Sequence, residues 1–244
     1  MTCHYYPPAD LDELEEEATQ ADVSSQVAAL QIVAGIFNRA GLPYGVMGGM
    51  NFYFRGTGRT TDDVDLAVTG EQSLEKTLEL LEGEERITRP RSRMAWVGGV
   101  ARTFVRVDKQ QVQIDLKWQK SEGHGMPLDL DSATEVFHLT KDKSAPGVRF
   151  LRVAPLVKAK FQSYGREKPG DYVDLLFICT HPKYGAEVEG VAGEIRLEKR
   201  ELFLREVGER HGGRVKEVGE VLGVDLNVLE EVAEADSDDD AEED

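Results

Sequence analysis

The sequence has little cysteine and no long apolar run, and both shortages narrow the class of protein. Two cysteines, Cys3 and Cys179, are too few for a disulfide framework and have no metal-binding spacing. No run of about 18 apolar residues is present, so we expect no membrane span. The first residues lack the basic and apolar regions of a secretion signal. Together these features favour a protein of the reducing cytoplasm.

Motifs of several enzyme classes are absent as well. No lysine follows a glycine run as in a P-loop, and neither a Gly-x-Ser-x-Gly elbow nor a His-Glu-x-x-His pair occurs. The five histidines are scattered along the chain. His124, between two glycines, is predicted to lie on a flexible loop, where a substrate contact is possible but a solvated side chain is the commoner case.

Positive charge is missing from both ends of the chain. The formal net charge is −17, yet the acidic excess lies in residues 1–22 and 230–244, which contain no lysine or arginine. The remaining body, 23–229, is formally neutral, which argues against long-range attraction to nucleic acid or to an anionic membrane. The segment 230–244 is expected to be a disordered tail, either a solubilising one or one that binds a basic protein partner.

Two segments place aspartates on the polar face of predicted strands. In residues 63–68, Asp63 and Asp65 stand two apart and therefore point to one face, while apolar residues alternate with them. Residues 111–118 alternate in the same way and put Asp115 on the polar face. Judged alone, Asp63 and Asp65 are equally compatible with a solvated junction between loop and strand, and a lone Asp115 is more often a surface residue than a ligand. Together, on neighbouring strands, the three carboxylates would form a site for two Mg²⁺ ions.

A glycine pair precedes the first of these strands. Gly48 and Gly49, a short helix, Arg59-x-Thr61-x-Asp63-x-Asp65 and a later strand with Asp115 together resemble the nucleotidyltransferase fold of the DNA polymerase beta superfamily. The similarity is greatest to the small nucleotidyltransferases of the toxin and antibiotic-modifying branches, and it covers roughly residues 28–180.

The resemblance implies a role for each matching residue. Asp63 and Asp65 would hold the metals that carry a nucleoside triphosphate, taken as ATP, and Asp115 would complete the second metal site and help to activate an acceptor hydroxyl. Gly48 and Gly49 would let the backbone approach the phosphates. Met50 stands where the family usually has a serine, which removes one expected phosphate contact. Arg59 and Thr61 belong to the same candidate nucleotide site.

The resemblance also reaches the segment between two predicted helices, 153–164 and 171–179. Its cations are candidates for triphosphate contact, since positive charge offsets that of phosphate. The alternative is a solvated helix face, with Asp171 as a helix cap. The candidates are Lys158 or Lys160, Arg166 and Lys168, with Asp171 and Asp174 as possible structural partners.

The order of the predicted elements indicates an α/β (α+β) protein, in which a mixed β-sheet nucleotidyltransferase-like core precedes a helical C-terminal extension. We expect an acidic segment at 1–22, the α/β domain at 23–152, the helical part at 153–229 and the tail at 230–244. The predicted helices are 24–40, 50–55, 71–82, 153–164, 171–179, 194–210 and 214–222. The predicted strands are 44–47, 63–68, a hairpin of 94–97 with 100–107, 111–118, 134–139 and 148–152.

Three hypotheses follow from this sequence. The first is Mg²⁺-dependent transfer of a nucleoside monophosphate from a nucleoside triphosphate to a hydroxyl of a small molecule or protein. The second is a binding or regulatory module that keeps the fold without nucleotidyl transfer, which Met50 and the acidic tail make plausible. The third retains the pocket for other small-molecule chemistry.

Overall fold

The computed structural model describes residues 3–69, 73–96, 99–118, 125–140, 146–166 and 168–226. The chain divides into two compact units, Met1–Leu156 and Val157–Asp244. The expectations for His124 and for the tail 230–244 lie outside the described residues.

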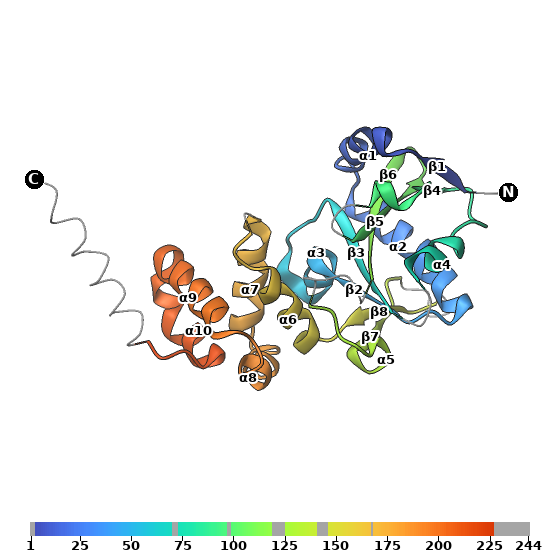
Figure 1. Cartoon of the computed structure of the whole chain (residues 1–244). Helices are drawn as coiled ribbons and strands as arrows, with labels where there is room; N and C mark the ends of the chain where they lie inside the picture. The colour runs from blue at the N-terminus through green and yellow to red at the C-terminus, as the bar shows by residue number, and fades with distance from the viewer. Residues whose placement is uncertain are drawn as a thin grey trace, which may run out of the picture. The chain divides into compact units, whose positions relative to one another are not determined.

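Within its described residues, the first unit contains an eight-stranded sheet in the order β1-β4-β5-β6-β3-β2-β8-β7 (Figure 1). Three neighbouring pairs are parallel, namely β1 with β4, β3 with β6 and β2 with β8, and the others are antiparallel. The strands are β1 (His4–Tyr6), β2 (Tyr44–Met47), β3 (Asp63–Val68), β4 (Ile87–Pro90), β5 (Val100–Val107), β6 (Gln110–Trp118), β7 (Thr134–Phe137) and β8 (Val148–Leu151). The predicted mixed sheet is therefore confirmed.

The helices follow the predicted change from a mixed α/β part to a helical part. The first unit holds α1 (Leu11–Ala18), α2 (Val23–Ala40), α3 (Gly48–Phe52), α4 (Leu74–Glu79) and α5 (Leu130–Ala133), with a π-helical turn at Tyr53–Thr57. Helix α6 (Val153–Ser163) leads into the second unit, which holds α7 (Pro169–Thr180), α8 (Gly185–Ala192), α9 (Leu197–His211) and α10 (Val215–Leu222). No helix among the described residues has the length and apolar character needed to cross a membrane.

Helix α2 covers the apolar face of the sheet and supplies much of the core of the first unit. Leu30, Val33 and Phe37 on this helix are fully buried and pack with the apolar residues of β3 and β6. Its start lies one residue before the predicted position, 24. The helix begins at Val23, so Asp22 is the cap, and its carboxylate accepts the N–H of Ser25 at 2.7 Å. Gly41, directly after the predicted helix end at residue 40, closes the helix in the left-handed conformation.

Strand alternation is confirmed in both segments that carry the aspartates. The apolar residues of β3 and β6 are completely buried on the α2 side: Val64, Leu66, Val68, Val112, Ile114 and Leu116. Gln113, Asp115 and Lys117 alternate with the apolar residues of β6 and therefore lie on the opposite face of the sheet. Burial of one face fixes the register of each strand, because a slip by one residue would bury the aspartates in the core.

The predicted strand at 94–97 is wrong for residues 94–96, and residue 97 lies outside the described residues. Residues Arg93–Ala95 form a 3₁₀ turn, and Met94 is 85% exposed. The partner of β5 on that side is β4, where the buried pair Ile87 and Val105 is in register. The apolar residues here therefore form a turn and not a strand: Met94 is exposed, whereas Trp96 is half-buried and packs against the core.

The acidic segment 1–22 contributes to the first unit. Tyr6 on β1 packs edge-to-face against Phe104 with ring centroids 5.6 Å apart, and Leu11 on α1 joins the same buried cluster. Strand β1 pairs with β4. The net charge of this segment did not predict β1 or α1, because the acidic side chains of α1 outnumber its apolar ones.

Candidate functional site

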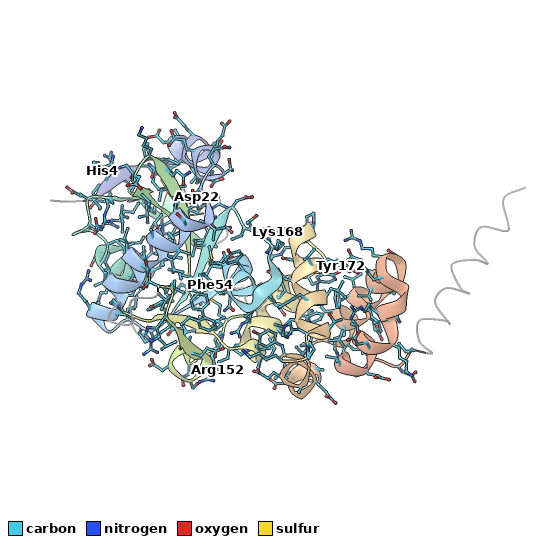
Figure 2. All side chains as sticks on the ribbon, turned by 180° about the vertical axis from the view of Figure 1, so that it is seen from behind. His4, Asp22, Phe54, Arg152, Lys168 and Tyr172 are labelled. Carbon is cyan, nitrogen blue, oxygen red and sulfur yellow. The ribbon has the colours of Figure 1, made fainter. Side chains whose placement is uncertain are left out.

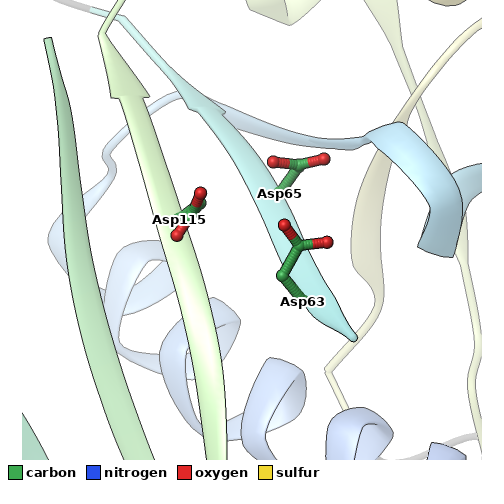
Figure 3. Close-up of side chains that lie close together, drawn as sticks. All are labelled: Asp63, Asp65 and Asp115. Atoms are coloured by element: carbon green, nitrogen blue, oxygen red, sulfur yellow. The ribbon is translucent and has the colours of Figure 1, made fainter. Parts of the chain in front are cut away.

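The three predicted aspartates meet on one face of the sheet. Strands β3 and β6 are parallel neighbours, and Asp65 is in register with Asp115. Asp63 stands two residues earlier on β3 and so points to the same side. One carboxylate oxygen from each residue lies within 4.8 Å of the others (Figure 3). The structure therefore brings together an acidic triad from two strands that are distant in sequence.

Burial and the repulsion between the three carboxylates disfavour the charged form of Asp115. Burial raises the pKa of Asp115 from its usual value of 3.8 to about 7, and the nearby charges of Asp65 and Asp63 add to the increase. A hydrogen bond from Nε2 of Gln113 to Oδ1 of Asp115, 2.8 Å long, acts in the opposite direction. A carboxylate cluster of this kind is the donor set that hard divalent cations favour, since such a cation would remove the repulsion.

Two protein cations lie beside the triad. The Nζ atom of Lys117 is 2.5 Å from Oδ1 of Asp65, and Nε of Arg102 is 3.8 Å from Oδ1 of Asp115. Burial lowers the pKa of Lys117, but the carboxylates, Asp65 above all, outweigh it and raise the pKa above its ordinary value. The predicted site did not include Lys117. The alternation of the polar residues 113, 115 and 117 places Lys117 on the same strand face as Asp115, but it does not identify Asp65 as its partner.

The glycine pair makes room for side chains of the site. Gly48 has φ +61°, and a Cβ atom there would lie 1.9 Å from Oδ2 of Asp65. A Cβ atom at Gly49 would lie 2.7 Å from Nη2 of Arg59 and 2.8 Å from the Thr61 side chain. The structure thus adds a second reason for these glycines besides the predicted approach of phosphate: they let Asp65, Arg59 and Thr61 pack against the turn.

The loop before β3 positions the first aspartate. Thr61 donates its hydroxyl to Oδ1 of Asp63 at 3.0 Å, and its own carbonyl accepts a hydrogen bond from Nε2 of Gln26 at 2.5 Å. Gln26 is 1% exposed on α2. Sequence reasoning missed Gln26, because a lone polar residue on an apolar helix gives no sign of the loop it will meet.

Replacing Gly48 by alanine should lower the free energy of unfolding by more than backbone strain alone would, because the new Cβ atom would displace Asp65 of the triad. Gly58, with φ +69° and open space at its Cβ position, provides the matched control. We expect Gly58→Ala to cost about 1 kcal/mol through its left-handed conformation alone. Gly48→Ala should cost at least about 2 kcal/mol more, because Asp65 must move, an effect comparable with overpacking a core. Urea unfolding of both variants measures the difference, and equal losses would contradict the proposed contact between Gly48 and Asp65.

The residues after the glycine pair have structural roles. Met50 is 1% exposed and belongs to the core, so it makes no polar contact of the kind expected from the family's serine. Asn51 is completely buried and donates to the carbonyls of Val46 and Leu151 at 2.7 and 3.0 Å. Its side-chain oxygen Oδ1 accepts a hydrogen bond from Nε of Arg55 at 2.8 Å. This network fixes α3 against β2 and β8, beside the glycine turn.

The other predicted cations belong to the second unit. Lys160 is 9% exposed and forms ion pairs with Asp171 at 2.8 Å and Asp174 at 3.0 Å, which confirms the structural pairing expected for these aspartates. Asp171 lies inside α7, and Lys168 holds the cap position in its place. Arg166 and Lys168 line a cavity of about 500 Å³ in this unit, and Figure 2 labels Lys168 with its neighbour Tyr172.

Removing the charge of Lys160 should destabilise the protein strongly. Lys160→Met leaves Asp171 and Asp174 buried without their central cation, a change that typically costs about 3–5 kcal/mol. Lys158→Met is the matched control, because Lys158 pairs with Glu194 at the surface and should contribute less than about 1 kcal/mol. Chemical unfolding followed by circular dichroism measures both, and a small effect at Lys160 would contradict its structural role.

The sequence and the structure were compared with those of known proteins. No protein-family profile matches the chain, and no curated protein sequence matches it. Among solved structures, an antigenic nucleotidyltransferase-like protein from Paracoccidioides brasiliensis matches with a TM-score of 0.52 at 14% identity, over 90% of this chain and 95% of that one.

Two Helicobacter pylori structures also match. One is described as a nucleotidyltransferase and has a TM-score of 0.45 at 14% identity, over 87% of this chain and 99% of that one. The other is the protein JHP933, with a TM-score of 0.46 at 13% identity, over 88% and 97%.

The chain therefore has a nucleotidyltransferase fold. The likeness to the Paracoccidioides protein covers nearly the whole of both chains, and the mixed sheet carries an acidic triad. At this level of identity the likeness establishes the fold, and the chemistry has to be argued from the site.

Proposed function

We propose that this protein is a Mg²⁺-dependent nucleotidyltransferase, which moves a nucleoside monophosphate from a nucleoside triphosphate to a hydroxyl group. The observation that carries the proposal is the triad of Asp63, Asp65 and Asp115, whose carboxylate oxygens lie within 4.8 Å of one another. The nucleotidyltransferase fold provides independent support.

The donor set fits divalent metal. All three groups are carboxylates, and the pKa of Asp115 is raised by burial and then by the nearby charges of Asp65 and Asp63. Asp63 and Asp65 would hold two Mg²⁺ ions, and Asp115 would complete the second site. When bound, Mg²⁺ would offset the charge of the triphosphate and help to orient it.

The residues of this chain would then position the reactants. The backbone at Gly48 and Gly49 would lie against the phosphates, with Arg59 as the adjacent cation and Thr61 holding Asp63 in place. The oxygen of the acceptor hydroxyl would form a bond to the α-phosphorus as the bond to pyrophosphate breaks. Its proton would pass to Asp115 or to water, and pyrophosphate would leave. Lys160, Arg166 and Lys168 remain predictions as triphosphate contacts.

A second candidate is a binding or regulatory protein that keeps the fold without transfer. Two observations favour it: Met50 is in the core where the family usually has a serine, and Lys117 pairs with one of the candidate metal ligands. The enzyme proposal further predicts ATP as the donor and a small molecule or a protein as the acceptor. Both candidates are compatible with a basic protein partner for the acidic tail.

Thermal unfolding with Mg²⁺ and each nucleoside triphosphate tests for binding. A triphosphate at 100 times its dissociation constant should stabilise the protein by about 2.7 kcal/mol. The shift should depend on Mg²⁺ and should be strongly reduced in Asp65→Asn. A shift with transferred label supports the enzyme, a shift without transfer supports the binding module, and no shift with any triphosphate argues against the proposed nucleotide site.

A further inference from the structure

Lys117 acts on one of the candidate metal ligands directly. It stands two residues after Asp115 on β6, so both point to the same face of the sheet. Its Nζ atom lies 2.5 Å from Oδ1 of Asp65, and the two side chains are only 18% and 11% exposed. Water screens such a shielded pair weakly, so its electrostatic interaction is stronger than that of a surface pair.

The surroundings of Asp65 limit how a metal ion can reach it. Oδ1 is the oxygen that contacts Lys117, and Oδ2 lies against the turn, where a Cβ atom at Gly48 would be 1.9 Å away. A divalent cation that binds Asp65 must therefore compete with the ammonium group for the same carboxylate. Arg102 differs from Lys117 in this respect, because it also pairs with Glu15 on α1 and is 3.8 Å from Asp115.

We propose that Lys117 is a displaceable counter-ion, which occupies Asp65 in the metal-free protein and is released toward an anionic ligand when a divalent cation binds. The inference rests on the proposed function only in assigning the triad to a metal. Its consequence is coupled loading: a metal alone must displace the ammonium group without offering it a new partner, whereas a triphosphate supplies one. By thermodynamic reciprocity, each ligand would then strengthen the binding of the other.

Direct binding of Mn²⁺ tests this inference without reference to catalysis. We expect Lys117→Met to bind Mn²⁺ about tenfold more tightly than wild type, within the usual range of coupling between sites. Lys117→Arg keeps a positive charge beside Asp65 and should therefore bind Mn²⁺ no more than about twofold more tightly than wild type. Lys109→Met is the control, because Lys109 lies exposed in the turn between β5 and β6 and its loss changes the net charge by the same amount. Electron paramagnetic resonance of free Mn²⁺ gives each affinity.

Equal or weaker Mn²⁺ binding by Lys117→Met would overturn the inference, as would equal tightening by Lys109→Met. If Lys117→Met folds poorly without metal, the increase in melting temperature at saturating Mn²⁺ replaces the affinity, and it should exceed that of wild type. The double variant with Asp65→Asn must lose the tightened binding, because tight binding that survives it would place the metal elsewhere. Tightened binding in a protein that transfers no nucleotide would support the counter-ion while rejecting the enzyme.

Discussion

Asp63→Asn is expected to lower the rate of nucleotide transfer by about a thousandfold and to leave the fold intact. Asparagine has nearly the same size and can still accept the hydrogen bond from Thr61, but it loses the charge that a Mg²⁺ ion requires. A metal ion contributes several kcal/mol of transition-state stabilisation, and each 1.36 kcal/mol corresponds to a factor of ten in rate. The measurement is transfer of label from α-labelled nucleoside triphosphates to a panel of hydroxyl acceptors.

Asp62→Asn is the control for this experiment. Asp62 is exposed and directly precedes Asp63, so its substitution removes the same charge one residue earlier in the chain without changing the triad. We expect Asp62→Asn to keep activity within a few-fold of wild type. Activity of Asp63→Asn equal to that of the control would remove Asp63 from the reaction.

Asp115→Asn is expected to stabilise the metal-free protein at pH 8 while abolishing its stabilisation by Mg²⁺. The pKa of Asp115 is raised from 3.8 to about 7 by burial and by Asp65 and Asp63. Above pH 7 the folded protein must hold a charged carboxylate that it disfavours. Since one pKa unit corresponds to 1.36 kcal/mol, the substitution should stabilise by about 2–4 kcal/mol at pH 8.

The pH dependence gives this prediction a definite sign. The folded pKa lies above the unfolded one, so the carboxyl contributes its full stability below pH 3.8 and loses it as the pH rises through about 7. In EDTA, wild type should become less stable than Asp115→Asn between pH 5 and pH 8, and Mg²⁺ should restore wild type alone. Urea unfolding at both pH values measures this, and parallel behaviour of the two proteins would contradict the buried repulsion.

These opposite effects share one physical cause. A site that gathers negative charge for a cation is costly to fold without it, so removing a carboxylate improves stability and removes binding. Lys160 provides the contrast, because its buried charge is already balanced by Asp171 and Asp174, and its loss should destabilise the protein.

The strand faces of the site were predictable from local sequence. Period-two alternation placed Asp63, Asp65 and Asp115 on polar faces, and burial of Val64 and Ile114 on the other side makes this register obligatory. That β3 and β6 are neighbours was not contained in the alternation. It followed from resemblance, and the pairing of Asp65 with Asp115 confirms it.

Features that depend on tertiary contacts could not be predicted from the sequence. The ion pair of Lys117 with Asp65 is diagonal between strands, since the register partner of Lys117 is Ala67. Periodicity within one strand therefore cannot reveal it. The same holds for Gly48, whose small size is required by a carboxylate 17 positions later in the chain. Strand β1 and helix α1 were missed because strong acidity outweighed a few apolar residues such as Leu11.

The central claim is that the acidic triad holds divalent metal together with a triphosphate. Crystals grown with Mn²⁺ and a non-hydrolysable nucleoside triphosphate would test it through anomalous scattering. The account predicts Mn²⁺ peaks within about 2.0–2.3 Å of carboxylate oxygens of Asp63, Asp65 and Asp115, with phosphate oxygens completing the coordination. Triphosphate bound elsewhere, or Mn²⁺ that avoids the triad, would contradict it.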